Sequence, residues 1–246
     1  MLLHAFPLNS SMWSAQLDAL PGLGGDEVRV LAPDQRGFGG TELGTDEPSL
    51  DLVADDLALL LDAAGIDRAV VGGLSMGGYV ALAFARRHPD RLSGLLLANT
   101  RATADTDAVR GNRERIAAAV TARDSVRLLL DERVAAGQLG PDSQHLVERV
   151  ETMVAAASPA AVAWAQRAMA ARPDALDVLA GLRVPVSLLA GALDALVPLE
   201  EVELMARTRP DAELIVVPGV GHLSALESPG AFDAAVRRLL LRVAAG

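Results

Sequence analysis

The chain of 246 residues contains no cysteine and no lysine, since all 22 of its basic residues are arginine. Without cysteine there is no disulfide, thiol nucleophile or cysteine-bound iron–sulfur cluster. Without lysine, Schiff-base chemistry, a Ser-x-x-Lys hydrolase and the lysine of a phosphate-binding P-loop are excluded too. These two absences remove several enzyme classes before any motif is considered.

Long apolar runs and excess positive charge are also missing. Hydrophobic residues make up 51% of the chain, yet no uninterrupted run approaches the roughly 18 residues that span a bilayer. The N-terminus has no basic segment, and its apolar start is broken at His4 and Asn9, so we expect no secretory signal. A net charge of −10 opposes binding to nucleic acid. We expect a soluble cytoplasmic protein without nucleic-acid or membrane partners, and association into a homo-oligomer stays open.

Histidine is scarce as well. Only four are present, His4, His88, His145 and His222, and no pair has the short spacing of a zinc helix or zinc finger. We therefore expect no metal ion and no cofactor.

One serine stands in a pattern typical of nucleophiles. Residues 73–78 read Gly-Leu-Ser-Met-Gly-Gly, between the apolar run 69–71 and a helix-like segment, 79–88. In a G-x-S-x-G sequence, glycines let strand and helix approach closely, and the sharp turn holds the serine in a strained conformation. Backbone N–H groups at the helix start then face any anion that forms beside the serine. Ser75 is the candidate nucleophile.

Two further residues complete an order of Ser, Asp and His along the chain. Asp194 follows the apolar run 184–190, and His222 follows the run 212–217. Loops at the carboxyl ends of parallel strands meet at one edge of the sheet, where ligands bind. We predict that Asp194 orients His222, which takes the serine proton. Other carboxylates stay open as the acid: Asp105, Asp107 and Glu227.

Together these motifs resemble the alpha/beta-hydrolase superfamily over nearly the whole chain. Residues 4–7 (His-Ala-Phe-Pro) resemble its oxyanion loop, with alanine where glycine is usual, and residues 34–39 resemble its D-x-R-G-x-G turn. Gly221-His222 with Glu227 and Pro229 resembles the histidine loop. With Asn99-Thr100, the chain looks most like the branch of 3-oxoadipate enol-lactonases and small carboxylesterases.

The resemblance implies an oxyanion hole made of the backbone N–H groups of Met76 and Phe6. It also implies that Phe6 lines the substrate pocket. Trp164 is a candidate substrate contact, with a packing role in the core as the alternative. We expect His4 to hold the oxyanion loop in place and to take no part in proton transfer.

The pattern of apolar runs predicts an α/β fold, with a mostly parallel sheet flanked by helices. The expected strands lie at 2–3, 28–32, 69–71, 92–98, 184–190 and 214–217. Residues 1–100 and 184–246 form the expected alpha/beta-hydrolase core, and 101–183 a helical cap broken near 137–141 and 158–159. Relatives begin with a hairpin, whereas Met1 falls within the expected first strand, so we expect this hairpin to be missing or shortened.

The leading functional hypothesis is a cofactor-free serine hydrolase that acts on a small carboxylic ester or lactone through an acyl-enzyme. Perhydrolysis and carbon–carbon bond hydrolysis use the same three residues and stay open. So do an acyl-transfer role in biosynthesis and a non-catalytic ligand-binding member of the fold, because a fold does not fix a function.

Overall fold

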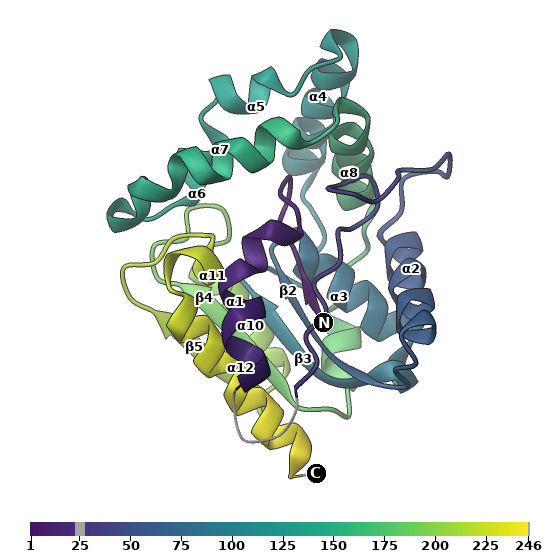
Figure 1. Ribbon diagram of the computed structural model, residues 1–246, viewed down its shortest axis with the longest axis vertical. Coiled ribbons are helices and arrows are strands. Elements are labelled where there is room, and N and C mark those ends of the chain that lie inside the picture. Colours follow the sequence, from purple (N-terminus) through teal and green to yellow (C-terminus); the bar gives the residue numbers. More distant parts are fainter. Residues whose placement is uncertain (23–27, 246) are drawn as a thin grey trace.

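A computed structural model describes residues 1–22 and 28–245, and Figure 1 shows the arrangement of its elements. The described strands form one parallel sheet in which spatial order follows chain order. They are β1 (Leu2–Leu3), β2 (Ala69–Leu74), β3 (Leu92–Ala98), β4 (Val186–Gly191) and β5 (Glu213–Val217). The mostly parallel sheet predicted from the sequence is confirmed.

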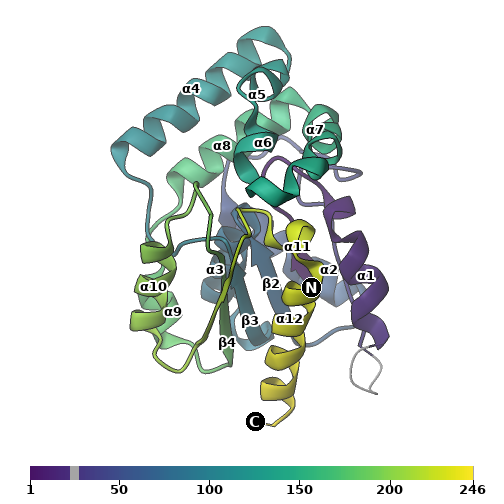
Figure 2. The same cartoon turned by 90° about the vertical axis from the view of Figure 1, so that its left-hand side faces the viewer.

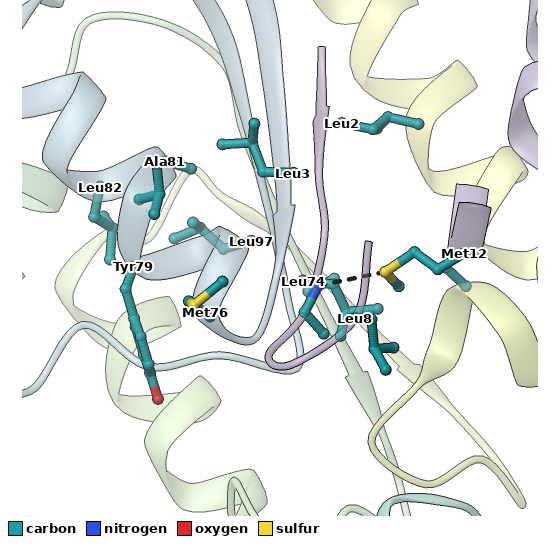
Figure 3. Packing of buried hydrophobic residues seen from close by; sticks show 14 of the residues in the cluster. Leu2, Leu3, Leu8, Met12, Leu74, Met76, Tyr79, Ala81, Leu82 and Leu97 are labelled. Atoms are coloured by element: carbon teal, nitrogen blue, oxygen red, sulfur yellow. Dashed lines mark hydrogen bonds between the residues drawn. The ribbon is translucent and has the colours of Figure 1, made fainter. Parts of the chain in front are cut away.

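The central strands are apolar along their length because helices cover both faces of the sheet. Leu95, Leu96 and Leu97 of β3 are all buried, although successive side chains of a strand point to opposite faces. In Figure 3, Leu3, Leu74 and Leu97 come from three neighbouring strands and belong to one packed cluster. This core fixes the strand ends from which the candidate site is built.

Helices fill the connections between strands, and two more follow the last strand. They are α1 (Ser14–Ala19), α2 (Leu50–Ala63), α3 (Met76–Arg87), α4 (Asp107–Arg123), α5 (Arg127–Asp131), α6 (Val134–Gln138), α7 (Val147–Ala156), α8 (Pro159–Ala171), α9 (Leu176–Gly181), α10 (Leu199–Thr208), α11 (Ser224–Glu227) and α12 (Pro229–Ala244). α12 packs on β3 and β4 with α1 beside it, while α3 packs on β1, β2 and β3 with α2 and α9 against it. Figure 2 shows α12 and α1 in front of the sheet.

The expected strand at residues 28–32 is wrong, because this segment has no strand assignment. It nevertheless lies along the free edge of β1, where the N–H of Leu2 donates a hydrogen bond to the carbonyl of Leu31 (2.8 Å). An isolated contact of this kind does not make a ladder. Val30, Leu31 and Ala32 are only partly buried against the core. The apolar run therefore predicted contact with the core, and the expected strand hydrogen bonding was wrong.

α4 to α8 lie beyond the carboxyl ends of the strands (Figures 1 and 2). The predicted breaks between them are confirmed: α6 ends at Gln138, and Ser158 caps α8 by accepting a hydrogen bond from the N–H of Ala161 (3.0 Å). α9 instead packs on α3 and α10. A cap domain spanning 101–183 stays a prediction. No helix in the described part of the chain is long and apolar enough to cross a membrane.

Candidate active site

Ser75 occupies the sharp turn between β2 and α3. Its backbone has φ +56° and ψ −114°, in a region that residues with a side chain rarely adopt. The turn requires glycine on both sides: a Cβ on Gly73 would lie 2.0 Å from the carbonyl oxygen of Gly77, and a Cβ on Gly77 would lie 2.1 Å from that of Leu3. This crowding explains the G-x-S-x-G pattern in terms of backbone contacts.

Hydrogen bonds from β3 hold this turn. The N–H of Ser75 donates to the carbonyl of Ala98 (3.0 Å), and the hydroxyl of Thr100 donates to the carbonyl of Ser75 (2.8 Å). Met76 is the first residue of α3, and the first N–H groups of a helix have no partner within it. The start of α3 therefore offers hydrogen-bond donors beside the serine.

His222 and Asp194 form a buried pair. Nδ1 of His222 lies 2.8 Å from Oδ2 of Asp194, and each side chain is only 2% exposed. The other carboxylate oxygen accepts hydrogen bonds from the N–H groups of Leu196 (2.9 Å) and Val197 (3.0 Å). Burial opposes ionisation of Asp194, but the contacts with His222, Asn99 and Val197 outweigh it and hold its pKa below the usual value. Asp194 is thus a carboxylate suited to fix Nδ1–H on the imidazole and leave Nε2 free.

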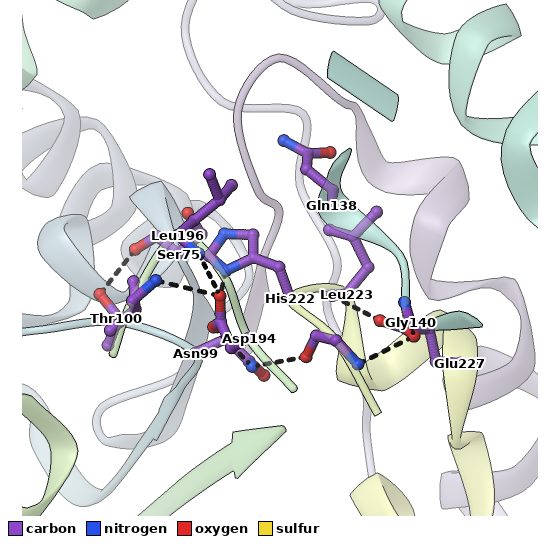
Figure 4. A network of polar contacts seen from close by, with 12 residues as sticks. Ser75, Asn99, Thr100, Gln138, Gly140, Asp194, Leu196, His222, Leu223 and Glu227 are labelled. Atoms are coloured by element: carbon purple, nitrogen blue, oxygen red, sulfur yellow. Dashed lines mark hydrogen bonds and ion pairs between the residues drawn. The ribbon is translucent and has the colours of Figure 1, made fainter. Parts of the chain in front are cut away.

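Asn99 ties the acid loop to the histidine loop. It follows β3 in a left-handed conformation (φ +47°), and its side-chain amide donates to Oδ2 of Asp194 (3.0 Å) and to the carbonyl of Gly221 (3.1 Å). Figure 4 shows this network around the imidazole. Sequence reasoning noted Asn99 only as a mark of the branch. The available signal was its position, since an amide directly after a parallel strand lies at the ligand-binding edge.

Glu227 fastens the histidine loop to the segment after α6. One of its carboxylate oxygens accepts hydrogen bonds from the N–H groups of Gly140 (2.8 Å) and Gly221 (3.0 Å), and the other accepts from Leu223 (2.9 Å). In addition, the N–H of His222 donates to the carbonyl of Gln138 (2.8 Å). Figure 4 shows Gln138, Gly140 and Glu227 beside the loop. Sequence reasoning had no signal for Gln138 or Gly140, because these contacts join distant parts of the chain.

A pocket with a volume of about 190 Å³ lies between the carboxyl ends of the strands and the helices α4, α6 and α8. Its sheet-side wall consists of Phe6, Ser75, Tyr79, Arg101, Leu196, Val197 and His222. Its helix-side wall comes from α4, α6 and α8 and consists of Val109, Asn112, Arg113, Ile116, Gln138, Gln166 and Met169. Ser75 and His222 therefore line one cavity, and α4, α6 and α8 form its opposite wall.

Comparison with known proteins identifies the family. Residues 1–235 match the model described as the alpha/beta hydrolase family. The chain belongs to this family. The malate-bound structure of a thermophilic esterase from Thermogutta terrifontis is 40% identical, with a TM-score of 0.91 over 98% of this chain and 89% of that one. The predicted resemblance to the superfamily is confirmed.

Two relatives with named activities also align along most of their length. The pimeloyl-[acyl-carrier protein] methyl ester esterase of Aromatoleum aromaticum is 34% identical over 93% of this chain and 92% of its own. The 3-oxoadipate enol-lactonase 2 of Acinetobacter baylyi is 27% identical over 95% of this chain and 85% of its own. The chain therefore resembles esterases and lactonases within the alpha/beta hydrolase family.

In this alpha/beta hydrolase, the predicted oxyanion loop lies against the pocket. Phe6 lines the cavity, packs edge-to-face on Phe38 at a centroid distance of 6.4 Å, and accepts a hydrogen bond at its carbonyl from Gln138 (3.4 Å). Ala5, which stands where the motif predicted from the sequence has glycine, is not among the described residues with positive φ. Its N–H donates to the sulfur of Met12 (3.3 Å). Alanine thus fits this position without backbone strain.

His4 links the predicted oxyanion loop to Gln35. Its Nδ1 lies 3.0 Å from the carbonyl of Ala5, and its Nε2 accepts a hydrogen bond from the N–H of Gln35 (3.0 Å). Burial lowers the pKa of His4 to about 4, so its imidazole is neutral at neutral pH. His4 does not line the pocket. These contacts agree with the structural role expected for it.

Trp164 does not reach the pocket. Its side chain is buried and lines a separate small cavity together with Gln35, Phe38 and Leu50, and its indole N–H donates to the carbonyl of Asp46 (2.8 Å). α8 turns Gln166 and Met169 toward the cavity instead. The predicted substrate contact of Trp164 is therefore not supported by its position, and the packing alternative fits.

The other candidate acids have other partners, and those of Glu227 are the backbone N–H groups of Gly140, Gly221 and Leu223. Asp105 is fully buried in ion pairs with Arg113 and Arg172, and the side chain of Asp107 is 99% exposed at the start of α4. Of the carboxylates weighed from the sequence, Asp194 is the one in contact with the imidazole of His222.

Proposed function

We propose that this protein is a serine hydrolase that cleaves small carboxylic esters or lactones through an acyl-enzyme. One observation carries the proposal: Ser75 sits in a strained turn in the same pocket as His222, and Nδ1 of His222 is hydrogen-bonded to the buried Asp194. A nucleophile, a base and a group that orients the base are the parts that acyl transfer requires. The esterase and lactonase relatives support the same reaction class.

In the proposed mechanism, the hydroxyl oxygen of Ser75 attacks the ester carbonyl while Nε2 of His222 takes its proton. Asp194 keeps the other ring nitrogen protonated and offsets the positive charge of the imidazolium. His222 then gives the proton to the departing alkoxide, and the acyl group stays on Ser75. Water, deprotonated by His222, attacks the acyl-enzyme, and the acid leaves with Ser75 restored.

The N–H groups of Met76 and Phe6 are proposed to stabilise the oxyanion. Met76 begins α3, so its N–H adds to the positive end of the helix dipole. Removing one donor of such a pair typically lowers turnover by about 100- to 1,000-fold. Because backbone donors are already fixed by the fold, they need little reorganisation as charge develops.

The helices α4 to α8 are proposed to act as a cap. α4, α6 and α8 contribute the helix-side wall of the pocket, and Gln138 bonds both to the oxyanion loop and to the histidine loop. A covered pocket excludes water that is not needed for deacylation and strengthens electrostatic interactions inside. We infer that substrate range depends on this wall, and that the substrate is a small molecule.

The test is hydrolysis of p-nitrophenyl butyrate by the wild type, by Ser75→Ala and by Ser11→Ala, which changes an exposed serine. We expect Ser75→Ala to lose at least about 1,000-fold in kcat/KM, with circular dichroism and Tm unchanged, and Ser11→Ala to retain full activity. Equal activity in the wild type and Ser75→Ala would contradict the proposed nucleophile. Absence of activity from the wild type with this and a panel of lactones would favour a ligand-binding role.

A further inference from the structure

The pocket that contains Ser75 and His222 is basic, although the chain as a whole carries a net charge of −10. Two arginines, Arg101 and Arg113, line it, and no aspartate or glutamate is among the described residues that do so. The other polar side chains of the helix-side wall are amides. An excess of positive charge in a small covered cavity favours an anionic ligand.

The charge of Arg113 is only partly balanced. Its Nε lies 2.5 Å from one oxygen of Asp105, while Nη2 of Arg172 lies 2.8 Å from the other oxygen. Burial opposes ionisation of Asp105, but the hydrogen bonds from Arg172 and Arg113 outweigh it and hold its pKa below the usual value. Two guanidinium groups thus share one carboxylate, and the three side chains carry one net positive charge. Arg172 also lies 3.8 Å from the ring centre of Tyr79, which lines the pocket.

Arg101 has no carboxylate of its own among the described residues. It follows Thr100 at the end of β3, next to the turn that contains Ser75, and its Nε is buried without a hydrogen-bond partner. None of the ion pairs formed within residues 1–22 and 28–245 includes it. The nearby Glu201 accepts a hydrogen bond from the hydroxyl of Thr103 (2.7 Å). Arg101 as a whole is half-buried: burial opposes its charge, but the nearby Tyr79, Asp105 and Glu201 outweigh this and hold its pKa above the usual value. A charged guanidinium on the pocket wall with no ion pair of its own can bind an anion.

We propose that Arg101 binds a free carboxylate on the acyl part of the substrate, so that the preferred substrates are half-esters or lactones of small dicarboxylic acids. A planar guanidinium matches a carboxylate in geometry and binds it with charge-assisted hydrogen bonds. Arg113 and Arg172 add positive potential, and the amide of Gln166, which accepts from Arg113 (3.1 Å), holds that side chain in place. This inference rests on the proposed hydrolase function and adds the substrate class.

The kinetic test compares two p-nitrophenyl esters of equal chain length, the half-ester of glutaric acid and the neutral pentanoate. The variants are Arg101→Gln, Arg101→Lys and the control Arg110→Gln, which changes an arginine that pairs with the exposed Asp107 and lies outside the pocket lining. Rates of Ser75→Ala are subtracted as background. A hydrogen bond to a charged group is worth about a 10- to 100-fold change in affinity.

We expect the wild type to prefer the glutarate half-ester by about tenfold or more in kcat/KM. Arg101→Gln lowers kcat/KM for the half-ester about tenfold more than for the pentanoate and so abolishes this preference, Arg101→Lys restores part of it, and Arg110→Gln leaves it intact. A wild type without preference, or an equal loss on both esters in Arg101→Gln with Arg101→Lys no better, would overturn the proposal. So would an equal loss of preference in Arg110→Gln, since bulk charge would then be the cause.

A binding measurement separates this proposal from the proposed function. Titration calorimetry with glutarate needs no turnover, and we expect binding to the wild type and to Ser75→Ala but not to Arg101→Gln. Glutarate binding without hydrolysis of either ester would leave the carboxylate site standing and reject the hydrolase. Pentanoate hydrolysis without glutarate binding and without half-ester preference would reject the carboxylate site alone.

Discussion

Different kinds of contact stabilise the sheet-side wall and the helix-side wall of the pocket. On the sheet side, Ser75, Asp194 and His222 are fixed largely by hydrogen bonds that involve backbone groups at strand ends and loops. On the helix side, α4 and α8 are joined by side-chain ion pairs: Arg167 of α8 with Glu114 of α4, and Arg172, just after α8, with Asp105, just before α4. Backbone contacts depend on the fold alone, whereas ion pairs depend on particular residues. We therefore expect substitutions on the two walls to have different effects.

The largest effect is expected on the sheet side, from Asp194→Asn. The amide would no longer hold Nδ1–H on His222 as a carboxylate does, although its size is similar. We expect kcat/KM for p-nitrophenyl butyrate to fall by about 1,000- to 10,000-fold, while Asp18→Asn, at an exposed position, has no effect. A loss of less than tenfold with the fold intact would mean that another group orients the imidazole.

On the helix side, Asp105→Asn is expected to affect stability most. Removing one partner of a buried ion pair typically costs about 3–5 kcal/mol, and here two arginines lose their carboxylate. Because the pKa of Asp105 is lowered from 3.8 in the folded protein, its contribution is present above that value and is lost as the pH falls through the folded pKa. Urea unfolding of the wild type and of Asp105→Asn at pH 7 and at pH 3 measures this contribution to the free energy of unfolding. A difference from the wild type that does not shrink in acid would contradict the ion-pair account.

Glu227→Gln tests the hydrogen bonds by which Glu227 joins the histidine loop to Gly140, after α6. A glutamine offers one acceptor in place of two carboxylate oxygens, and its NH₂ group faces backbone N–H donors. We expect kcat to fall by about tenfold with little change in KM, and the free energy of unfolding to fall by about 2 kcal/mol. The exposed Glu200→Gln is the matched control. An unchanged kcat with lowered Tm would restrict Glu227 to a stabilising role.

The smallest effect is expected from Trp164→Phe. This change removes the hydrogen bond to the carbonyl of Asp46 and should lower the free energy of unfolding by about 1 kcal/mol. Since Trp164 is absent from the pocket lining, kcat/KM for p-nitrophenyl butyrate should stay within about twofold of the wild type. A rise of tenfold in KM would restore Trp164 as a substrate contact.

The difference between the walls also explains what the sequence could predict. Ser75 directly follows β2, and Asp194 and His222 lie in the loops after β4 and β5, so their position at the carboxyl ends of the strands follows from the parallel sheet. Glycine is required in the turn by close contacts with neighbouring backbone atoms, so the motif could be recognised from the sequence.

The remainder depends on contacts between distant residues. Arg113 and Arg172 meet at Asp105, and Gly140 meets Glu227, only once the helices have packed. Residues 28–32 failed as a predicted strand because an apolar run reports burial and not a hydrogen-bonded ladder. The family resemblance supplied the oxyanion loop, while the alanine at position 5 could be judged only from its observed backbone conformation.

The most direct test of the account is covalent labelling of Ser75. Intact-protein and peptide mass spectrometry after treatment with a small fluorophosphonate should find one adduct per chain, on the peptide that contains Ser75. Ser75→Ala should remain unlabelled, and Asp194→Asn should react far more slowly. An adduct on another serine, or equal labelling of Ser75→Ala, would contradict the assignment of Ser75 as the nucleophile on the sheet-side wall.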